Sequence, residues 1–250
     1  MTRRRFIADS FSPETGHPTT AALTGDQALH LARVLRAQPG QVFDVVANGF
    51  LHRAEITSVS ESEVAFTLLE ELESDAALPL HLLLAIYKFD HLEWAIEKTT
   101  ELGVAKITPI LARRTEKHLA QAAPKRVERW RRIALEASKQ SRRTTIPEIA
   151  DPVALKAALE QETSPTQILL SETEQQTTLA DILGCPTSGL SDVGFQTTHA
   201  LAIGPEGGWT PEEMALFTQH QWQHVTLGPR ILRAETAAIA ATAIASTYLG

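Results

Sequence analysis

The first third of the chain alternates hydrophobic and polar positions as half-buried β-strands do. The Asn48-Gly49 pair, between two such stretches, is a strong signal for a tight hairpin. Residues 24–36 instead carry hydrophobic residues near helical spacing and stop before Pro39-Gly40. These patterns predict a small, mostly β unit with one short helix. Its expected strands are residues 41–46, 51–59 and 63–69.

From residue 80 the pattern changes to short hydrophobic runs separated by amphipathic stretches. The run at 81–87 is continuously hydrophobic, as expected for a strand covered on both faces. A helix should follow, opened by a capping box at Asp90 and Glu93 and closed at Gly103. This alternation predicts an α/β fold with a parallel sheet. Further expected strands are residues 106–111, 167–170, 200–203 and 224–227.

Three later segments carry helix signals. Thr210-Pro211 with Glu213 combines a Thr cap, a proline at the first helical position and a capping-box carboxylate. Residues 234–248 form an Ala-rich stretch suited to close packing. Pro124 suits the start of a basic helix. The hydrophobic stripe of that helix is expected at Val127, Trp130, Ile133, Ala134 and Ala137.

The change of pattern places a domain boundary at residue 74, at the start of a linker over 74–79. We therefore expect a β unit at residues 1–74 and an α/β unit at residues 75–250. The Gly-, Ser- and Thr-rich residues 184–198 are expected to form a mobile loop.

Two of the expected strands run into similar Gly-Pro loops. Residues 203–209 read IGPEGGW, residues 227–237 read LGPRILRAETA, and each loop leads into a helix. Open α/β sheets bind ligands beyond the carboxyl ends of their strands, so we expect the loops to end adjacent strands and form a ligand site. Neither loop matches the Rossmann or Walker A pattern. The alternative for the first loop is a tight turn without a ligand.

Carboxylates indicate which ligand would suit the first loop. A helix N-terminus favours phosphate, but Glu206, Glu212 and Glu213 crowd this one. A polyphosphate such as ATP or NAD would meet like charge. A ligand with hydroxyl groups and a cationic centre fits better, and S-adenosylmethionine, with its ribose and sulfonium, is such a ligand.

The second loop combines a stiff backbone with hydrophobic and cationic side chains. Pro229 fixes a backbone dihedral, and Ile231 and Leu232 are placed to line a slot for adenine. Arg230 and Arg233 are the candidate charges of the site. The alternative is that both arginines are surface charges or pair with a nearby glutamate (Glu206 or Glu235).

The formal net charge of −7 argues against a nucleic-acid partner, but the distribution of charge reverses this. Residues 113–143 hold eleven Lys or Arg against three Glu, so this segment is +8 and the remainder −15. A local basic patch is what binds a polyanion. The alternative is a solvated helix face with an ordinary pair between Glu128 and Arg132. The expected RNA-binding residues are Arg3, Arg4, Arg5, Arg33, Arg36, Lys125, Arg126, Arg129, Arg132, Arg142 and Arg143.

Other features exclude several classes of protein. A single cysteine, Cys185, allows no internal disulfide and no Cys-rich metal site. The nine histidines lack metal-ligand spacing, so no metal is expected. The N-terminus lacks the hydrophobic run of a signal peptide, and no stretch is long enough to span a membrane. We therefore expect a cytoplasmic protein.

Several motifs together resemble the SPOUT methyltransferases, in particular the RsmE family of 16S ribosomal RNA uridine N3-methyltransferases. The resemblance covers nearly the whole chain, and the two Gly-Pro loops are its most specific parts. Its other motifs are Arg33-Val34-Leu35-Arg36-x-x-x-Gly40, Glu97-Lys98-x-x-Glu101-Leu102-Gly103-Val104, Ile107-Thr108-Pro109, Ala137-x-x-Gln140-Ser141 and Pro147-Glu148-Ile149.

The resemblance implies a PUA-like β-barrel domain followed by a SPOUT domain with a C-terminal trefoil knot. It also implies S-adenosylmethionine as methyl donor, 16S rRNA in the 30S subunit as substrate, and a homodimer with active sites at its interface. The general rules of topology argue against knots, so the knot rests on the resemblance alone.

Carried over by position, the family's cofactor pocket falls on three loops of this sequence. The first follows strand 167–170, and the other two are the Gly-Pro loops. The implied cofactor-binding residues are Leu170, Ser171, Glu172, Ile203, Gly204, Pro205, Glu206, Gly207, Gly208, Leu227, Gly228, Arg230, Ile231, Leu232, Arg233, Thr236 and Ala237.

The implied reaction requires that the proton on uridine N3 leaves, through a base or through cations that favour the uridine anion. The sequence contains no unambiguous base. Arg230 and Arg233 are expected to stabilise charge on the uracil oxygens, and Glu206 is a candidate proton acceptor. Two rival functions stay open: a SPOUT methyltransferase for another RNA, such as a tRNA 2′-hydroxyl, and a non-catalytic RNA-binding protein.

Overall fold

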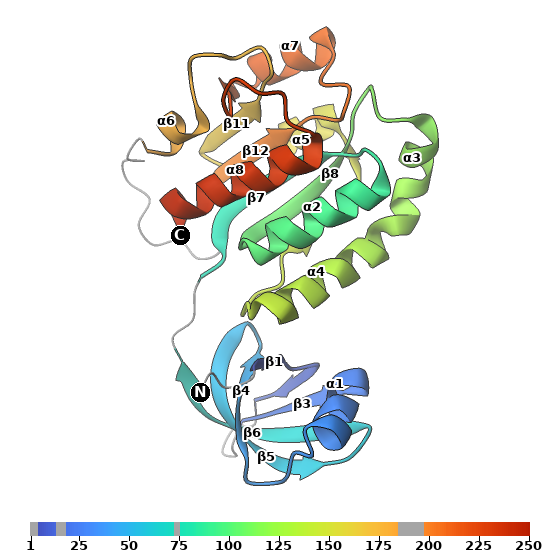
Figure 1. The fold of residues 1–250 in the computed structure, drawn as a ribbon, viewed down its shortest axis with the longest axis vertical. Coiled ribbons are helices and arrows are strands. Elements are labelled where there is room, and N and C mark those ends of the chain that lie inside the picture. The colour runs from blue at the N-terminus through green and yellow to red at the C-terminus, as the bar shows by residue number, and fades with distance from the viewer. Residues whose placement is uncertain (1–4, 14–18, 73–75, 185–197) are drawn as a thin grey trace. The chain divides into compact units, whose positions relative to one another are not determined.

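The computed structural model of the protein describes residues 5–13, 19–72, 76–184 and 198–250 (Figure 1). The chain divides into two compact units. The first contains residues 1–76 and 138–145, and the second contains residues 77–137 and 146–250. The expected boundary at residue 74 and almost all of the expected loop at 184–198 lie outside the described residues.

The first unit is a curled six-stranded sheet. Its strands lie in the order β1-β4-β5-β6-β3-β2, so two strands that follow each other in the chain lie at opposite ends of the sheet. The two residues between them join these ends: Ala8 N–H donates to Val46 in β4 (2.8 Å), and Asp9 N–H donates to Ala22 in β3 (2.9 Å). The sheet therefore curls toward closure, as a barrel does. The strands are β1 Arg5–Ile7, β2 Ser10–Ser12, β3 Thr20–Thr24, β4 Val42–Ala47, β5 Phe50–Val59 and β6 Glu63–Leu72.

The three strands and the one helix that were expected in this unit are confirmed, as β4, β5, β6 and α1. The expected helix is α1, Gly25–Leu29, continued by a π-helical turn, η1, at His30–Val34. Asn48 and Gly49 have positive φ angles of 49° and 83°, so both central residues of the hairpin adopt the left-handed conformation of a type I′ turn. Leu23, Leu31, Ile56 and Phe66 are almost completely buried and form the core under the curled sheet.

The second unit is a parallel sheet covered on both faces, as the α/β pattern predicts (Figure 1). The strands lie in the order β10-β8-β7-β12-β11-β13, and β9 pairs with β8. The strands are β7 Leu78–Ala85, β8 Val104–Leu111, β9 Glu148–Ile149, β10 Val153–Ala154, β11 Thr166–Leu170, β12 His199–Ile203 and β13 Gln223–Val225. The helices are α2 Phe89–Glu101, α3 Lys117–Ala122, α4 Val127–Ser141, α5 Leu155–Gln161, α6 Leu179–Leu183, α7 Pro211–Gln219 and α8 Ala234–Leu249, with a 3₁₀ turn, η2, at Ala123–Arg126.

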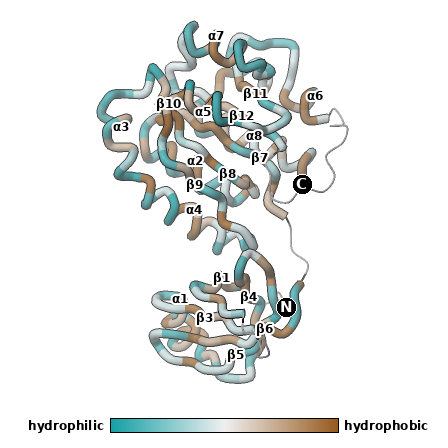
Figure 2. The backbone as a smooth tube through the Cα atoms, turned by 180° about the vertical axis from the view of Figure 1, so that it is seen from behind, coloured by the Kyte–Doolittle hydropathy of each residue, from teal (hydrophilic) through white to brown (hydrophobic). Residues whose placement is uncertain are grey.

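Neighbouring residues of one strand pack against different helices in this unit. Leu82 joins the core formed with α2, α4, α6 and α8, whereas Leu83 joins the core formed with α5 and α7. Successive side chains of a strand point to opposite faces, so a strand buried on both sides must be continuously hydrophobic. Figure 2 shows mainly hydrophobic residues along the central strands and alternating hydrophobic and hydrophilic residues along α4.

Three local expectations were wrong. Asp90 and Glu93 form no capping box, because α2 begins at Phe89 and Glu93 instead pairs with two arginines of the basic segment, Arg126 and Arg129. Pro124 opens no long helix: it lies in the η2 turn that precedes α4.

The third correction concerns the strands that carry the two Gly-Pro loops. They are not adjacent, because β11 lies between β12 and β13 and pairs with both. The C-terminal ends of three neighbouring strands therefore contribute to the same edge of the sheet.

Candidate functional site

Three loops meet around one cavity at the C-terminal ends of β11, β12 and β13. The cavity has a volume of about 1150 Å³, and the loop between β7 and α2 also lines it. All of these strands are parallel, so their C-terminal ends lie on one edge of the sheet, where α/β proteins bind ligands. The cavity therefore lies where the two Gly-Pro loops predicted a ligand site, and the loop after β11 also lines it.

The loop after β12 is held in place from both sides. A Cβ atom at Gly204 would come within 3.0 Å of the Trp209 indole, so the tryptophan packs directly on the glycine backbone. Arg114, from the loop after β8, donates a hydrogen bond to the Gly207 carbonyl. Gly208 has a φ of +70°, a conformation that favours glycine. Close packing and a hydrogen bond therefore fix the conformation of this loop.

Glu213 connects this loop to the one after β8. Its carboxylate is buried and accepts hydrogen bonds from the Arg113 amide (2.7 Å) and from the Thr210 amide (2.8 Å). Thr210 in turn caps α7, which confirms the predicted capping box. Glu213 therefore has a structural role. Glu206 is the carboxylate of this loop that lines the cavity.

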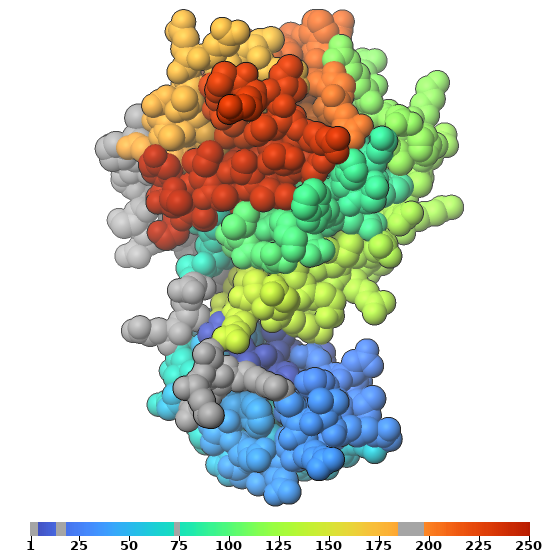
Figure 3. All heavy atoms as spheres, viewed as in Figure 1, coloured from blue at the N-terminus to red at the C-terminus, as the bar shows by residue number. Residues whose placement is uncertain are grey.

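The loop after β13 exposes its arginines. Gly228 has a φ of +112°, and Thr226 holds it by hydrogen bonds to its amide and its carbonyl, both at 3.1 Å. Arg230 and Arg233 are exposed, and no ion pair joins either of them to Glu206, Glu235 or any other described residue. The alternative in which these arginines form ion pairs with Glu206 or Glu235 is therefore wrong. Figure 3 shows the orange-to-red segment that contains this loop at the surface.

The loop after β11 carries two further carboxylates, Glu172 and Glu174. The Glu174 carboxylate accepts hydrogen bonds from the amides of Gln175, Gln176 and Thr177. These bonds, that from Thr177 first, lower the pKa of Glu174. Glu174 therefore stabilises its own loop, whereas Glu172 lines the cavity without such bonds to the backbone of the described residues.

A histidine and two glutamates meet at the edge of the cavity that α2 forms. His91 Nδ1 lies 3.6 Å from Glu206 Oε1 and 3.6 Å from Glu235 Oε1. Glu235 is only 2 % exposed, and its Oε2 has no hydrogen-bond partner among the described residues. Burial, with the charges of Glu235 and Glu206, raises the pKa of Tyr87 well above its usual range. Negative charge is therefore concentrated around one imidazole.

The cavity brings together almost all of the expected cofactor-binding residues. Thr236 is the exception, because it is exposed and does not line the cavity. His91, Lys88 and Arg114 also line the cavity, although the sequence patterns did not point to them. Ligands bind beyond the carboxyl ends of parallel strands, and this applies to β7 as well as to β12 and β13. The position of Lys88 and His91 shortly after a buried strand could therefore have identified them as site residues.

The expected RNA-binding residues differ in how far they are already paired. Glu93 accepts hydrogen bonds from Arg129 (2.8 Å) and Arg126 (3.3 Å). Arg33 pairs with Glu61 at 2.7 Å. Arg5 donates to the Arg142 carbonyl. Arg3 and Arg4 lie outside the described residues.

Two other residues of the basic segment remain available to a ligand. Lys125 and Arg132 are exposed, and nothing in the described part of the chain pairs with them. The pair that was expected between Glu128 and Arg132 is wrong, since Glu128 pairs with Arg131 at 2.6 Å. Arg143 is partly buried, and burial lowers its pKa to about 10.

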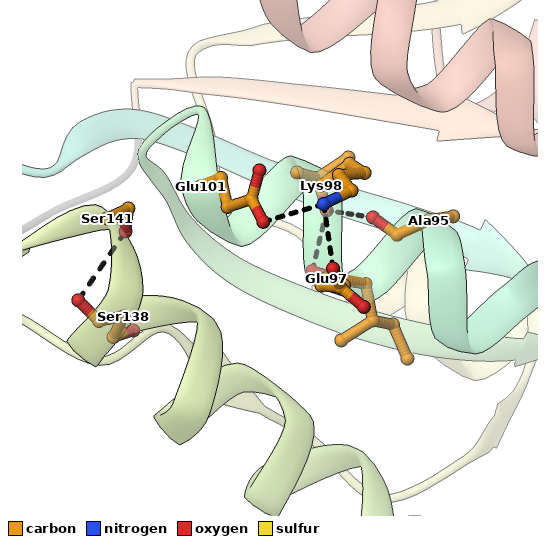
Figure 4. A network of polar contacts seen from close by, with 8 residues as sticks. Ala95, Glu97, Lys98, Glu101, Ser138 and Ser141 are labelled. Carbon is orange, nitrogen blue, oxygen red and sulfur yellow. Dashed lines mark hydrogen bonds and ion pairs between the residues drawn. The ribbon is translucent and has the colours of Figure 1, made fainter.

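The Glu97-Lys98-x-x-Glu101 motif lies on α2, away from the cavity. Lys98 Nζ bridges Glu97 (2.7 Å) and Glu101 (2.8 Å), as Figure 4 shows. Hydrogen bonds to Glu101 and to Glu97 raise the pKa of Lys98. The motif therefore organises the surface of α2 instead of lining the cavity.

Neither a membrane segment nor a metal centre is found in the described residues. Their helices are all too short or too polar to cross a bilayer. Their His, Cys, Asp and Glu side chains form no group of three or more that could hold a metal ion.

Comparisons with known proteins agree with this geometry. Residues 74–246 match the family model of the RNA methyltransferase domain, and residues 23–69 match that of the RNA methyltransferase PUA domain. The chain is 34 % identical to ribosomal RNA small subunit methyltransferase E of Synechocystis over 93 % of this chain and 74 % of the relative. It is 30 % identical to the Bacillus subtilis protein of that name over 94 % of this chain and 92 % of the relative.

A solved structure matches the chain from end to end. It is a ribosomal RNA small subunit methyltransferase E from Neisseria gonorrhoeae bound to S-adenosyl methionine. The two chains superpose with a TM-score of 0.79 and 29 % sequence identity, covering 98 % of each.

Proposed function

The chain belongs to the ribosomal RNA small subunit methyltransferase E family, and on this premise we propose that it methylates N3 of a uridine in 16S rRNA. The methyl donor is S-adenosylmethionine, and the substrate is the RNA within the assembled 30S particle. The observation that carries the proposal is the cavity at the ends of β11, β12 and β13, which uses the loops that the resemblance assigns to the cofactor.

The lining of the cavity fits this cofactor. Leu227, Leu232 and Ala237 offer hydrophobic surface for an adenine ring. Glu172 and Glu206 offer acceptors for ribose hydroxyls and negative charge near a sulfonium. When bound, the cofactor supplies an electrophilic methyl group. The chain's own residues then have to orient the uridine, exclude water and remove the N3 proton.

Gly228, at positive φ in the loop after β13, provides a test of cofactor binding. Gly228→Ala should weaken binding of S-adenosylmethionine about 10-fold or more, because φ of +112° costs an alanine on the order of 1–3 kcal/mol. Calorimetric titration measures the change. Gly49→Ala is the matched control, since Gly49 also has a positive φ (+83°), in the first unit. Equal affinities in G228A and G49A would contradict the role of this loop.

The exposed arginines of the loop after β13 can stabilise the negative charge that develops on the uracil. Removal of the N3 proton places negative charge on the neighbouring carbonyl oxygens, and a preorganised guanidinium stabilises such charge. Arg230 and Arg233 line the cavity without ion-pair partners among the described residues, so both can donate to a substrate. Glu206, half-exposed at the cavity, is one candidate acceptor of the N3 proton.

The basic segment is proposed to contact RNA phosphates, with Lys125 and Arg132 contributing more than the paired Arg126 and Arg129. The double change Lys125→Ala, Arg132→Ala should reduce the slope of log K against log salt concentration by about 2. Arg131→Ala should leave the slope nearly unchanged, because Arg131 already pairs with Glu128 and Asp151. Filter binding of 16S rRNA across a salt series measures both. An unaltered slope in the double variant would assign the segment to an ordinary solvated surface.

A trefoil knot and a cytoplasmic homodimer belong to the same proposal. Support for the knot is that Thr226, directly after β13, exchanges backbone hydrogen bonds with Thr177 (2.9 Å) and Leu179 (3.1 Å), in the segment that follows β11. Support for the homodimer is hydrophobic surface on this part of the chain: Ile231 is 82 % exposed and Tyr248 is 47 % exposed.

Methyl incorporation from labelled S-adenosylmethionine distinguishes the proposal from its rivals. Undermethylated 30S particles, free 16S rRNA and tRNA are incubated separately with the protein. We expect labelling of the 30S particle above that of either free RNA. Preferential labelling of tRNA would indicate a methyltransferase for another RNA. Binding of RNA without labelling and without calorimetric binding of the cofactor would indicate a non-catalytic RNA-binding protein.

A further inference from the structure

We propose that His91 accepts the N3 proton of the uridine, with Glu235 as the residue that positions its imidazole. This inference rests on the proposed function and names the group that the reaction requires. His91 belongs to the first turn of α2, lines the cavity and has a side chain that is 30 % exposed. His91 is therefore accessible to a substrate, and the buried Glu235 carboxylate lies beside its imidazole.

The tautomer of His91 follows from its neighbours. Nδ1 is buried, has no hydrogen-bond partner in the described residues, and lies 3.6 Å from carboxylate oxygens of both Glu206 and Glu235. Ionised carboxylates only accept hydrogen bonds, so the favourable tautomer carries its proton on Nδ1. Nε2 then has a lone pair that can accept a proton. Among the described residues, the charged group paired with Nε2 is the exposed Asp90, at 3.8 Å.

Glu235 suits a positioning role. It is the second residue of α8, a 16-residue helix, where the helix dipole favours negative charge. Its side chain is 3 % exposed, Oε2 has no hydrogen-bond partner among the described residues, and His91 is the basic group paired with it. A buried carboxylate in this position stabilises an imidazolium as it forms, as the aspartate of a Ser-His-Asp triad does.

The other titratable groups around the cavity are less suited to accept the proton. The Tyr87 hydroxyl keeps its own proton, because burial and the charges of Glu235 and Glu206 raise its pKa. Lys and Arg side chains are donors while they are charged. Glu206 is the competing acceptor, and it is 44 % exposed. The charged groups that line the cavity or face His91 are Lys88, Asp90, Arg114, Glu172, Glu174, Glu206, Arg230, Arg233 and Glu235.

The step balances in atoms and charge. The N3–H electron pair of the uridine forms the new N3–CH₃ bond as the S–CH₃ bond breaks and its electrons pass to sulfur. The N3 proton goes to His91 Nε2, and the imidazolium is stabilised by Glu235 and Glu206. Release of this proton to solvent at the exposed edge of the cavity restores the neutral imidazole.

The pH dependence of the reaction tests the assignment. Methyl transfer to 30S particles is measured at saturating cofactor from about pH 5.5 to about pH 9.5, with cofactor affinity measured separately. In the wild type we expect the rate to rise with pH and then level off, as it does for a reaction that requires a neutral general base. His91→Gln should be about 10²- to 10⁴-fold slower near neutral pH, should keep rising with pH as the uridine itself ionises, and should bind the cofactor normally.

Three further variants separate positioning from structure. Glu235→Gln should move the plateau to lower pH, because it removes a negative charge 3.6 Å from the imidazole that becomes positive in the reaction. His91→Asn places an amide group beside Glu235 but cannot take a proton. It should therefore behave like H91Q, and it keeps the test valid if H91Q folds poorly. His118→Gln is the matched control, since His118 is 72 % exposed and pairs only with Glu116 among the described residues.

Two results would overturn the assignment: a wild-type plateau and rate in H91Q and H91N, or a loss of activity that follows a loss of cofactor affinity. Loss of the plateau in Glu206→Gln instead would move the role to Glu206. A wild-type protein that produces no N3-methyluridine at all would contradict the proposed function, which is a distinct outcome.

Discussion

Replacing Arg233 with alanine is expected to slow methyl transfer about 10²- to 10³-fold, the usual effect of removing one donor that stabilises charge in a transition state. Arg233 lines the cavity, precedes α8 and is exposed, and no described residue pairs with it. Its charge is therefore available to the uracil oxygens, and its removal leaves no buried group unpaired. The fold should be unaffected, with thermal unfolding close to that of the wild type.

Lys156→Ala provides the control for the Arg233 variant. Lys156 is 70 % exposed on α5, which packs on the other face of the sheet, so the variant removes a positive charge away from the cavity. Methyl transfer to 30S particles is measured for both at saturating cofactor. Near-normal turnover in R233A would remove Arg233 from the reaction, and an equal loss in K156A would point to a nonspecific effect of charge.

Acid should destabilise the second unit through Glu162. Its carboxylate is 4 % exposed and lies 2.6 Å from His81 Nδ1, while His81 Nε2 lies 2.7 Å from Thr108 Oγ1. Burial alone would raise the pKa of Glu162. The hydrogen bond and charge of His81, with hydrogen bonds from Ser164, outweigh burial and lower the pKa to about 2. The native state therefore holds this carboxylate ionised at a pH where the unfolded chain protonates it.

The direction of the effect follows from proton linkage. A carboxylate whose pKa is lower in the folded chain stabilises the fold above its unfolded pKa of about 4.3, and this contribution is lost as pH falls toward 2. The shift corresponds to roughly 3 kcal/mol. Glu162→Gln should therefore be less stable by about that amount near pH 6.5, and the difference from wild type should shrink by pH 3.

Tryptophan fluorescence during urea unfolding measures this difference. All four tryptophans, Trp94, Trp130, Trp209 and Trp222, belong to the second unit, so their signal reports the unit that contains Glu162. Glu160→Gln is the control, since Glu160 is 54 % exposed on α5. A stability difference between E162Q and wild type that stays constant from pH 6.5 to pH 3 would contradict the linkage.

Hydrophobic patterning predicted most of the fold. The continuous run at 81–87 and the Ala-rich stretch at 234–248 correspond to β7 and α8, because both are buried regular elements whose periodicity is fixed by packing. The short helix α6 was missed although Thr178 and Asp181 form a capping box there. Five residues contain too little periodicity to distinguish a helix from a turn.

The errors arose where long-range pairing decides the structure. Asp90 and Glu93 have the spacing of a capping box, but Glu93 accepts hydrogen bonds from two arginines that lie over thirty residues away in the chain. The order of β11, β12 and β13 is equally a tertiary property, since sequence order does not fix which parallel strand lies in the middle.

The same distinction between local and long-range structure explains why only part of the candidate site was predicted. Glycine and proline mark the loops after β12 and β13, so local chemistry identified them. His91 and Glu235 carry no local signal of that kind. They meet because α2 and α8 pack side by side on one face of the sheet (Figure 1), and only the folded chain brings them within 3.6 Å.

Mass mapping of the modified nucleotide tests the central claim most directly. Undermethylated 30S particles are incubated with the protein and S-adenosylmethionine, and the 16S rRNA is digested to nucleosides and to fragments for mass spectrometry. We predict one new methyl group, on N3 of a single uridine, that is absent with R233A. A methyl group on a ribose 2′-hydroxyl or on another base, or no methyl group on 16S rRNA, would contradict the account.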